Sequence, residues 1–354
     1  MKRLACGTAL AVAALVHVAA MVSAVLLSPP AIAASVSDAT GCGDALAQKK
    51  FDEGVASCTR ALNAPRINAS DRAYIYQRRG RLFVALRKFD EAIADFSELI
   101  RLKPGFAEIY ADRANAYGNI GEGEKALADA DEAVRLDPAS IRMRLFRGNA
   151  RTNLGKYDQA ITDFEAVIRA DPRNGEAYMG RARLHARMAR PEQAMADLDA
   201  AVRTNPDSMP FRNARGMARM QARQYAGAIE DFDVLIRGNP DEALHYNNRC
   251  YTLALADRAR DALPDCDKAL SLRPNFPAAL DSKAFVHLRL GEYQTAIENY
   301  DAALRSSPKM PSALYGRGIA RLRMGETAGN EDVVEALKIE PAIAARMAVV
   351  GVTP

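Results

Sequence analysis

The chain has no tryptophan and only four histidines among its 354 residues, and its formal net charge is only +4. A charge so close to neutral argues against nucleic-acid binding by bulk electrostatics. No two histidines share a metal-ligand spacing, no Cys–His pair falls within one local motif, and no glycine-rich phosphate loop occurs. We therefore expect no metal, no cofactor, no nucleic-acid partner and no catalytic residue, which together predict a non-enzymatic protein.

The first 33 residues differ in character from the rest. Lys2 and Arg3 form a short basic start, an Ala/Val/Leu-rich run follows over 4–27, and the segment ends in the small-x-small sequence 31–33. This pattern predicts a secretory signal peptide over 1–33, cleaved after Ala33. The alternative is an uncleaved N-terminal membrane anchor. With cleavage, we expect no membrane span and an exported chain, either periplasmic or secreted.

Prolines recur at a fixed interval along most of the chain. Seven prolines follow one another at intervals of 34 residues, and Pro341 follows the last of them after 33. An alanine lies twelve residues before each of the seven. A constant period of this length indicates stacked supersecondary units. The seven prolines are Pro104, Pro138, Pro172, Pro206, Pro240, Pro274 and Pro308, and the alanines are Ala92, Ala126, Ala160, Ala194, Ala228, Ala262 and Ala296.

Each unit has the pattern of two helices. In "FDEAIADFSELIRLKP" (89–104) the apolar residues are spaced for one face of a helix rather than alternating. The final proline ends that helix. Gly121, Gly155 and Gly291 fall between the two helices of their units, where a turn is needed. The sequence therefore predicts an all-α protein.

The repeat resembles the tetratricopeptide repeat (TPR) family. "AYIYQRRGRLFVALRKFDEAIADFSELIRLKP" (73–104) is a close match, with Tyr76 where the family usually has tryptophan. The resemblance covers 73–341 as eight repeats, after a degenerate unit over 34–72 and before a capping helix or tail over 342–354. It implies an α-solenoid, a right-handed superhelix of about nine helix-turn-helix units whose first helices line the concave face.

A basic residue in the first helix of each unit recurs with an acidic residue in the second. One interpretation is a row of arginines for anionic ligands. We favour the other, a structural ladder of Arg–Asp pairs that joins helix to helix. The ladder consists of Arg79 with Asp95, Arg113 with Asp129, Arg147 with Asp163, Arg181 with Asp197, Arg215 with Asp231, and Arg249 with Asp265.

The resemblance also implies a partner-binding groove along the first helices. Residues 23 and 19 before the prolines are four apart and share one helical face. Their amide and guanidinium groups suit the backbone of an extended peptide, and Arg183 with Arg187 favours an acidic one. The alternative is a merely solvated polar face. The groove residues are Asn115, Asn119, Asn149, Asn153, Arg183, Arg187, Gln221 and Tyr251.

These features predict an exported scaffold or adaptor that holds a protein or peptide partner of unknown identity in its groove. The alternative is an accessory recruiting subunit of a cell-envelope enzyme or of an assembly or secretion complex. An enzyme hidden in the array is the third possibility, for which no local motif speaks.

Four cysteines remain after the signal segment, in two pairs sixteen residues apart. Cys250 replaces the small residue of a first helix and Cys266 the larger residue of the second. Cys42 and Cys58 occupy the same two positions of the degenerate unit, relative to Phe51. Because these positions face each other across a helix hairpin, we predict the disulfides Cys42–Cys58 and Cys250–Cys266. The alternative is buried free thiols.

Overall fold

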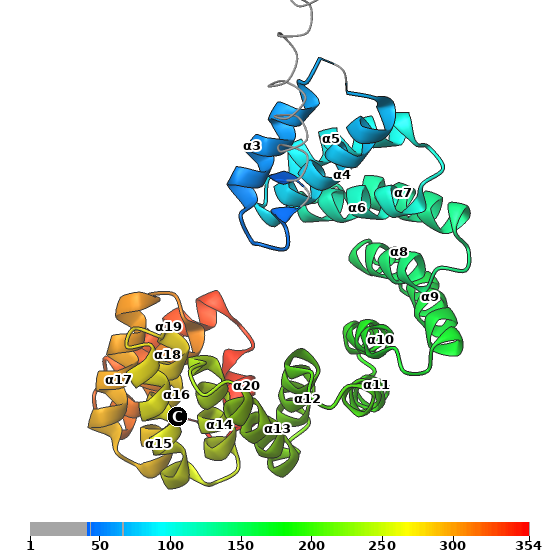
Figure 1. The fold of residues 1–354 in the computed structure, drawn as a ribbon. Coiled ribbons are helices and arrows are strands. Elements are labelled where there is room, and N and C mark those ends of the chain that lie inside the picture. The colour runs from blue at the N-terminus through cyan, green and yellow to red at the C-terminus, as the bar shows by residue number, and fades with distance from the viewer. Residues whose placement is uncertain (1–40, 43, 66, 354) are drawn as a thin grey trace, which may run out of the picture. The chain divides into compact units, whose positions relative to one another are not determined.

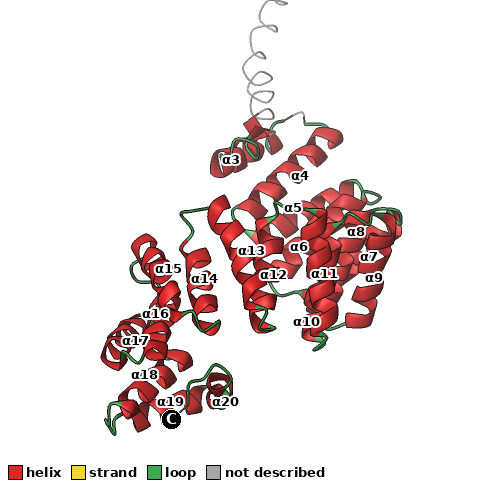
Figure 2. Ribbon diagram, turned by 90° about the horizontal axis from the view of Figure 1, so that it is seen from below, coloured by secondary structure: helices red, strands yellow, loops and turns green. Residues whose placement is uncertain are grey.

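The structure is a computed structural model that describes residues 41–42, 44–65 and 67–353. The predicted signal segment 1–33 lies outside these residues. Within them the chain forms eighteen helices and no strand (Figures 1 and 2). No helix in this part is long and apolar enough to span a bilayer. The all-α solenoid that the repeat pattern predicts is therefore confirmed.

The helices divide into two compact units, the first ending at Ala170 and the second beginning at Asp171. Unit 1 contains α3 (Phe51–Leu62), α4 (Ala69–Ala85), α5 (Phe89–Leu102), α6 (Ala107–Asn119), α7 (Gly123–Leu136), α8 (Ile141–Asn153) and α9 (Tyr157–Ala170). Unit 2 contains α10 (Gly175–Arg187), α11 (Pro191–Thr204), α12 (Met209–Gln221), α13 (Tyr225–Gly238), α14 (Ala243–Leu255), α15 (Ala259–Leu272), α16 (Pro277–Leu290), α17 (Tyr293–Ser306), α18 (Pro311–Arg323), α19 (Gly329–Ile339) and α20 (Ile343–Ala348).

The turn inside each helix pair uses one residue with positive φ. Glycine fills this place at Gly121, Gly155, Gly291 and Gly325, because it adopts that conformation without steric cost. In other pairs a side-chain-bearing residue holds it, at a cost of about 1–2 kcal/mol each. These residues are Arg87, Ala189, Arg223 and Asp257.

The helix α4 begins at Ala69, four residues before the expected start of the first repeat at 73. Asn68 caps it by accepting a hydrogen bond from the backbone N–H of Asp71 at 2.8 Å. The extra residues around "PRINAS" therefore extend the first helix by a turn instead of only lengthening the loop.

Several helix pairs pack by placing a large ring of the second helix against a small residue of the first. Phe96, Phe164 and Phe232 are fully buried. A Cβ added to Gly80 would lie 2.6 Å from the Phe96 ring, and one added to Gly148 would lie 3.0 Å from the Phe164 ring. The alternation of small and large residues in the sequence is therefore a requirement for close helix approach.

The backbones of α18 and α19 approach each other closely where Gly318 faces Gly329. A Cβ on Gly318 would lie 2.8 Å from the carbonyl oxygen of Gly329. We expect Gly318→Ala to lower the free energy of unfolding by about 1–3 kcal/mol in denaturant titrations. Gly118→Ala is the matched control, because a Cβ there meets nothing within 4 Å. It should raise stability by about 0.5–1 kcal/mol, so equal effects of the two changes would contradict this account.

Candidate functional site

The structure places all six predicted Arg–Asp pairs in contact. Their closest N–O distances are 2.5–2.7 Å, and each carboxylate side chain is at most 9 % exposed. Arg79, for example, donates from Nε and Nη2 to the two oxygens of Asp95. Such two-point pairing fixes the angle between the paired helices as well as their distance.

A second row of carboxylates, which the sequence reasoning missed, binds Arg147, Arg215 and Arg249 from the preceding repeat. Arg215 also contacts Asp199 at 3.1 Å, and Arg249 also contacts Asp233 at 2.6 Å. These aspartates lie seven residues before the prolines, a regularity that the sequence does show. Each such arginine therefore links its own helix pair to the previous one, which supports the structural interpretation of the ladder.

The predicted groove residues are distributed over both units. In unit 1, Asn115 and Asn119 lie on α6, and Asn149 and Asn153 lie on α8, all exposed. The Asn119 amide donates to the Asn115 carbonyl oxygen at 2.8 Å, so part of its hydrogen-bonding capacity is used within the helix. A binding role for this row stays a prediction.

In unit 2 the predicted residues differ in their surroundings. Arg183 and Arg187 are exposed on α10. Gln221 and Tyr251 instead line a cavity of about 280 Å³ with apolar neighbours that include Leu255 and Val350. We call it the apolar pocket. Two of the eight predicted groove residues therefore lie at a cavity of the described chain.

A second cavity, of about 260 Å³, also has Tyr251 in its lining. We call it the polar pocket, because Asn247, Asp281, Tyr300 and Ser312 also line it. They come from α14, α16, α17 and α18, so consecutive repeats build it together. Met220, Arg346 and Met347 line both pockets, which makes them neighbours.

Two buried oxygen atoms of the polar pocket lack a hydrogen-bond partner in the described chain. They are Oδ1 of Asn247, which is 7 % exposed, and the hydroxyl of Tyr300, which is 0 % exposed. Buried polar atoms are nearly always bonded, because desolvation without a partner costs about 1–3 kcal/mol. The polar pocket is therefore a place in unit 2 where a ligand could bond to two such atoms.

Asp281 supplies negative charge to the same pocket. It accepts a hydrogen bond from the Ser312 hydroxyl at 2.9 Å. Burial raises the pKa of Asp281 to about 6, against the opposing effects of this bond and of the Arg346 charge. The Arg346 guanidinium binds Glu340 through two contacts of 3.0 Å.

The sequence carries a signal for this pocket that the groove analysis did not use. One helical turn before the predicted groove row, 27 residues before the prolines, unit 2 has Asn213, Asn247 and Asp281. The corresponding residues of three preceding repeats are Ala111, Leu145 and Met179. Gln77 of the first repeat is polar at this position as well, so the signal is the run of polar residues in three consecutive repeats, two of which line the pocket.

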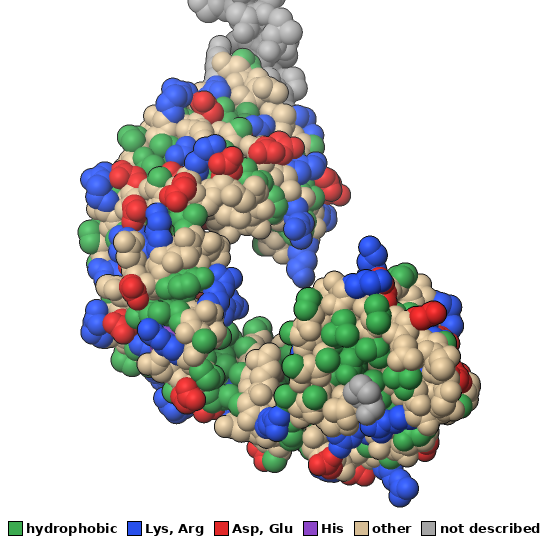
Figure 3. Space-filling model, turned by 180° about the vertical axis from the view of Figure 1, so that it is seen from behind, with side chains coloured by type: hydrophobic (Ala, Val, Ile, Leu, Met, Phe, Trp, Pro, Cys, Tyr) green, Lys and Arg blue, Asp and Glu red, His purple; other side chains and the backbone are tan. Residues whose placement is uncertain are grey.

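The C-terminal segment, residues 343–353, contributes to the lining of both pockets of unit 2. Ile343 and Met347 of α20 are buried in its core. Beyond the helix, Arg223 donates to the Val349 carbonyl at 3.2 Å and Arg289 to that of Val350 at 2.7 Å. Figure 3 shows hydrophobic side chains gathered on this unit, with basic and acidic ones interspersed elsewhere. Unit 2 therefore holds a peptide segment through arginine–carbonyl bonds.

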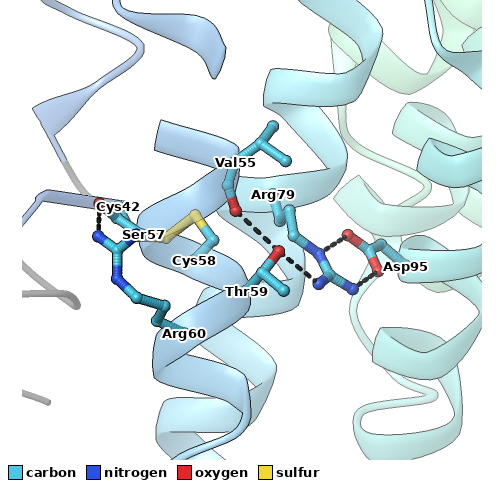
Figure 4. The surroundings of a disulfide bond; sticks show 8 residues. All are labelled: Cys42, Val55, Ser57, Cys58, Thr59, Arg60, Arg79 and Asp95. Atoms are coloured by element: carbon cyan, nitrogen blue, oxygen red, sulfur yellow. Dashed lines mark hydrogen bonds and ion pairs between the residues drawn. A yellow bond between two sulfur atoms is a disulfide. The ribbon is translucent and has the colours of Figure 1, made fainter. Parts of the chain in front are cut away.

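Both predicted cysteine pairs are joined in the structure. The Cα atoms are 4.8 Å apart for Cys42–Cys58 and 5.5 Å apart for Cys250–Cys266, and all four side chains are buried. These distances suit disulfide bonds. Figure 4 shows the first pair beside Thr59, which accepts a hydrogen bond from Arg79 at 3.0 Å. The degenerate N-terminal repeat is thus joined to the Arg–Asp ladder of the following repeat.

The raised pKa of Asp281 leads to a stability prediction. Its folded pKa of about 6 exceeds the ordinary value of 3.8, so the folded state binds the proton more tightly. Stability contributed by this group therefore increases as the pH falls from about 7 to 4. Asp281→Asn should raise the free energy of unfolding at pH 7.5 by up to about 3 kcal/mol. It should also flatten the pH dependence in urea titrations, and a destabilised variant would contradict this.

The charged and ionisable neighbours of Asp281 are Arg346 of α20, Tyr251 of α14 and Tyr300 of α17. The matched control is Asp207→Asn, which makes the same chemical change at an exposed position. It should alter neither the stability nor its pH dependence.

Models of the tetratricopeptide repeat match residues 78–141 and 147–210, and a second such model matches 286–325. Together with the fold, these matches support a protein of the tetratricopeptide repeat family. No curated protein sequence matches it significantly.

Several solved structures share the fold. A TPR protein from Parabacteroides merdae has 16 % identity and a TM-score of 0.51, covering 75 % of this chain and 99 % of its own. The C-terminal part of a TPR protein from Cytophaga hutchinsonii has 17 % identity and a TM-score of 0.53, covering 68 % and 98 %. PilF of Pseudomonas aeruginosa has 15 % identity and a TM-score of 0.51, covering 61 % and 98 %. These similarities show the fold alone, a scaffold that suits protein–protein interaction and is typically non-enzymatic.

Proposed function

We propose that the chain is an exported, non-enzymatic adaptor that holds a protein or peptide partner in the groove along its first helices. The observation that supports this most directly is the position of the C-terminal segment. Arg223, Arg289 and Arg323 donate to the backbone carbonyls of 349, 350 and 353. Backbone recognition of this kind accommodates peptides of different sequence.

Export is supported by the basic, apolar and small-x-small succession over 1–33 and by the two cysteine pairs. N-terminal sequencing of the protein from fractionated cells tests it. We expect a chain that begins at Ala34 in the periplasmic or secreted fraction. Recovery from the cytoplasm with Met1 retained would contradict export, and membrane-bound protein with residues 1–33 retained would favour the anchor.

Site-specific photo-crosslinking in living cells tests partner binding. Benzoylphenylalanine replaces Gln221 or Leu255 in the groove of unit 2, and Glu230 on the outer helix α13 serves as the matched control. We expect one defined protein to be crosslinked at both groove positions and not at the control. Crosslinks confined to Glu230, or catalytic turnover by the purified chain alone, would overturn the proposal. A crosslinked envelope enzyme would indicate the accessory-subunit role instead.

A further inference from the structure

The polar pocket combines three oxygen groups that have spare hydrogen-bonding capacity. Asn247 and Tyr300 each have a buried oxygen without a hydrogen-bond partner among the described residues, and the Asp281 carboxylate accepts a hydrogen bond from the Ser312 hydroxyl. All of them line one cavity of about 260 Å³. A single water takes up about 30 Å³, so the cavity has room for a larger group.

The chemistry of these groups selects for a ligand that donates hydrogen bonds and carries positive charge. A carboxylate and an amide oxygen only accept, and a phenol hydroxyl can also accept. An ammonium has three N–H donors and a guanidinium has five, and neither has an acceptor. An anionic group could accept hydrogen bonds from the amide and hydroxyl groups of the lining, but it would lie beside the Asp281 carboxylate, and the nearby Arg346 already binds Glu340.

One cationic side chain of the protein itself, Arg346, lies at the edge of this pocket. Arg346 lines the cavity, and its charge acts on Asp281 and Tyr251, but its guanidinium bonds are made to Glu340. Met217, Met220 and Phe285 form apolar parts of the lining. Such a wall suits the hydrocarbon stem of an arginine or lysine side chain while its head reaches the oxygens.

We infer that the polar pocket is a subsite for an arginine or lysine side chain of the partner, bound by Asp281, Asn247 and Tyr300. This inference rests on the proposed function and adds to it the chemistry of the partner. The adjoining apolar pocket, with Leu255 and Val350, takes the apolar residues beside that basic side chain. The partner segment is therefore basic and apolar in unit 2, whereas exposed Arg183 and Arg187 had favoured an acidic one.

Fluorescence anisotropy with defined peptides tests this subsite on the full purified chain. The probe is a fluorescein-labelled nonapeptide with a central arginine flanked by leucine and alanine. Its twins carry citrulline, which has the same shape without the charge, or glutamate at the centre. We expect the arginine peptide to bind at least about tenfold tighter than the citrulline peptide and the glutamate peptide to bind most weakly, because a charge-assisted pair is lost.

Two variants separate ligand binding from folding. Asp281→Asn removes a buried charge, Tyr300→Phe removes a buried hydroxyl, and both keep the shape of the side chain, so neither should lower the melting temperature. Both variants should nevertheless bind the arginine peptide more weakly than the unchanged chain does. Asp281→Asn should also reduce the preference for the arginine peptide over the citrulline peptide to less than about threefold. Asp207→Asn, the exposed control, should retain the preference. A structural role would instead lower stability and leave the preference unchanged.

The inference is overturned if the arginine and citrulline peptides bind equally, as expected for a pocket that holds only water. It is also overturned if Asp281→Asn retains the preference, or if no peptide binds. If the proposed adaptor function itself is wrong, the crosslinking experiment in cells gives the evidence, because no partner is then crosslinked at the groove positions. A partner crosslinked at Gln221 but unaffected by Asp281→Asn would refute this subsite alone.

Discussion

Asp163→Ala is expected to lower the free energy of unfolding by about 3–5 kcal/mol. The Asp163 side chain is only 3 % exposed and binds both Arg147, at 2.6 Å, and Arg151, at 2.8 Å. Its removal leaves two partly buried guanidinium groups without their main counter-charge. The cost is therefore mainly the desolvation of the remaining charges rather than the loss of one contact.

Asp131→Ala is the matched control, because Asp131 contacts the same two arginines at 3.4 and 3.2 Å with its side chain 48 % exposed. An exposed pair contributes at most about 1 kcal/mol, so this change should be small. Urea titration gives both values, and hydrogen exchange should locate the loss of protection in α8 and α9. Equal costs for the two aspartates would refute the structural ladder. The ladder would also be refuted if Asp163→Ala abolished the binding of one anionic ligand and left the stability unchanged.

Replacement of both Cys250 and Cys266 by alanine is expected to lower stability by about 2–4 kcal/mol. The bond closes a loop between α14 and α15, and Pro264 lies inside α15, where it removes a backbone hydrogen bond. The disulfide restricts the unfolded chain and so offsets that weakness. Peptide mapping without reductant should find this linkage in protein recovered from its natural compartment.

The Cys42–Cys58 pair provides an internal comparison. It joins the N-terminal end of the array, so its loss should increase hydrogen exchange mainly in α3 and leave unit 2 protected. Thermal melts with and without reductant measure the combined effect. Four titratable thiols in the unfolded, unreduced protein would contradict both bonds and favour buried free cysteines.

The repeat pattern predicted much of the fold because its information is local. Helix spacing and the small-large alternation at Gly80 and Phe96 are visible within one repeat, and the proline period is visible from two neighbouring repeats. Every unit then packs on its neighbours by the same contacts. The six Arg–Asp pairs followed from this register, since residues sixteen apart face each other across one hairpin.

The candidate site was predicted only in part. Gln221 and Tyr251 were identified and line cavities, but Asn247, Asp281 and Tyr300 were missed. The predicted groove positions cover only two turns of each first helix. Asn247 and Asp281 lie one turn earlier on their first helices, and Tyr300 lies on a second helix. A single aspartate at such a position looks like an ordinary surface residue, because burial is not written in its local sequence.

The sequence by itself determined the repeat, the helix pairs, the ladder register and the cysteine positions, since each depends on periodicity within neighbouring units. Only the tertiary structure decided where the C-terminal segment lies and which polar groups are buried without partners. The contact between Arg223 and Val349 joins residues 126 positions apart, which no local pattern specifies. The burial of Asp281 likewise requires α14, α16, α18 and α20 to meet around one cavity. Desolvation is a property of that assembled space, and so the chemistry of the pocket emerges only on folding.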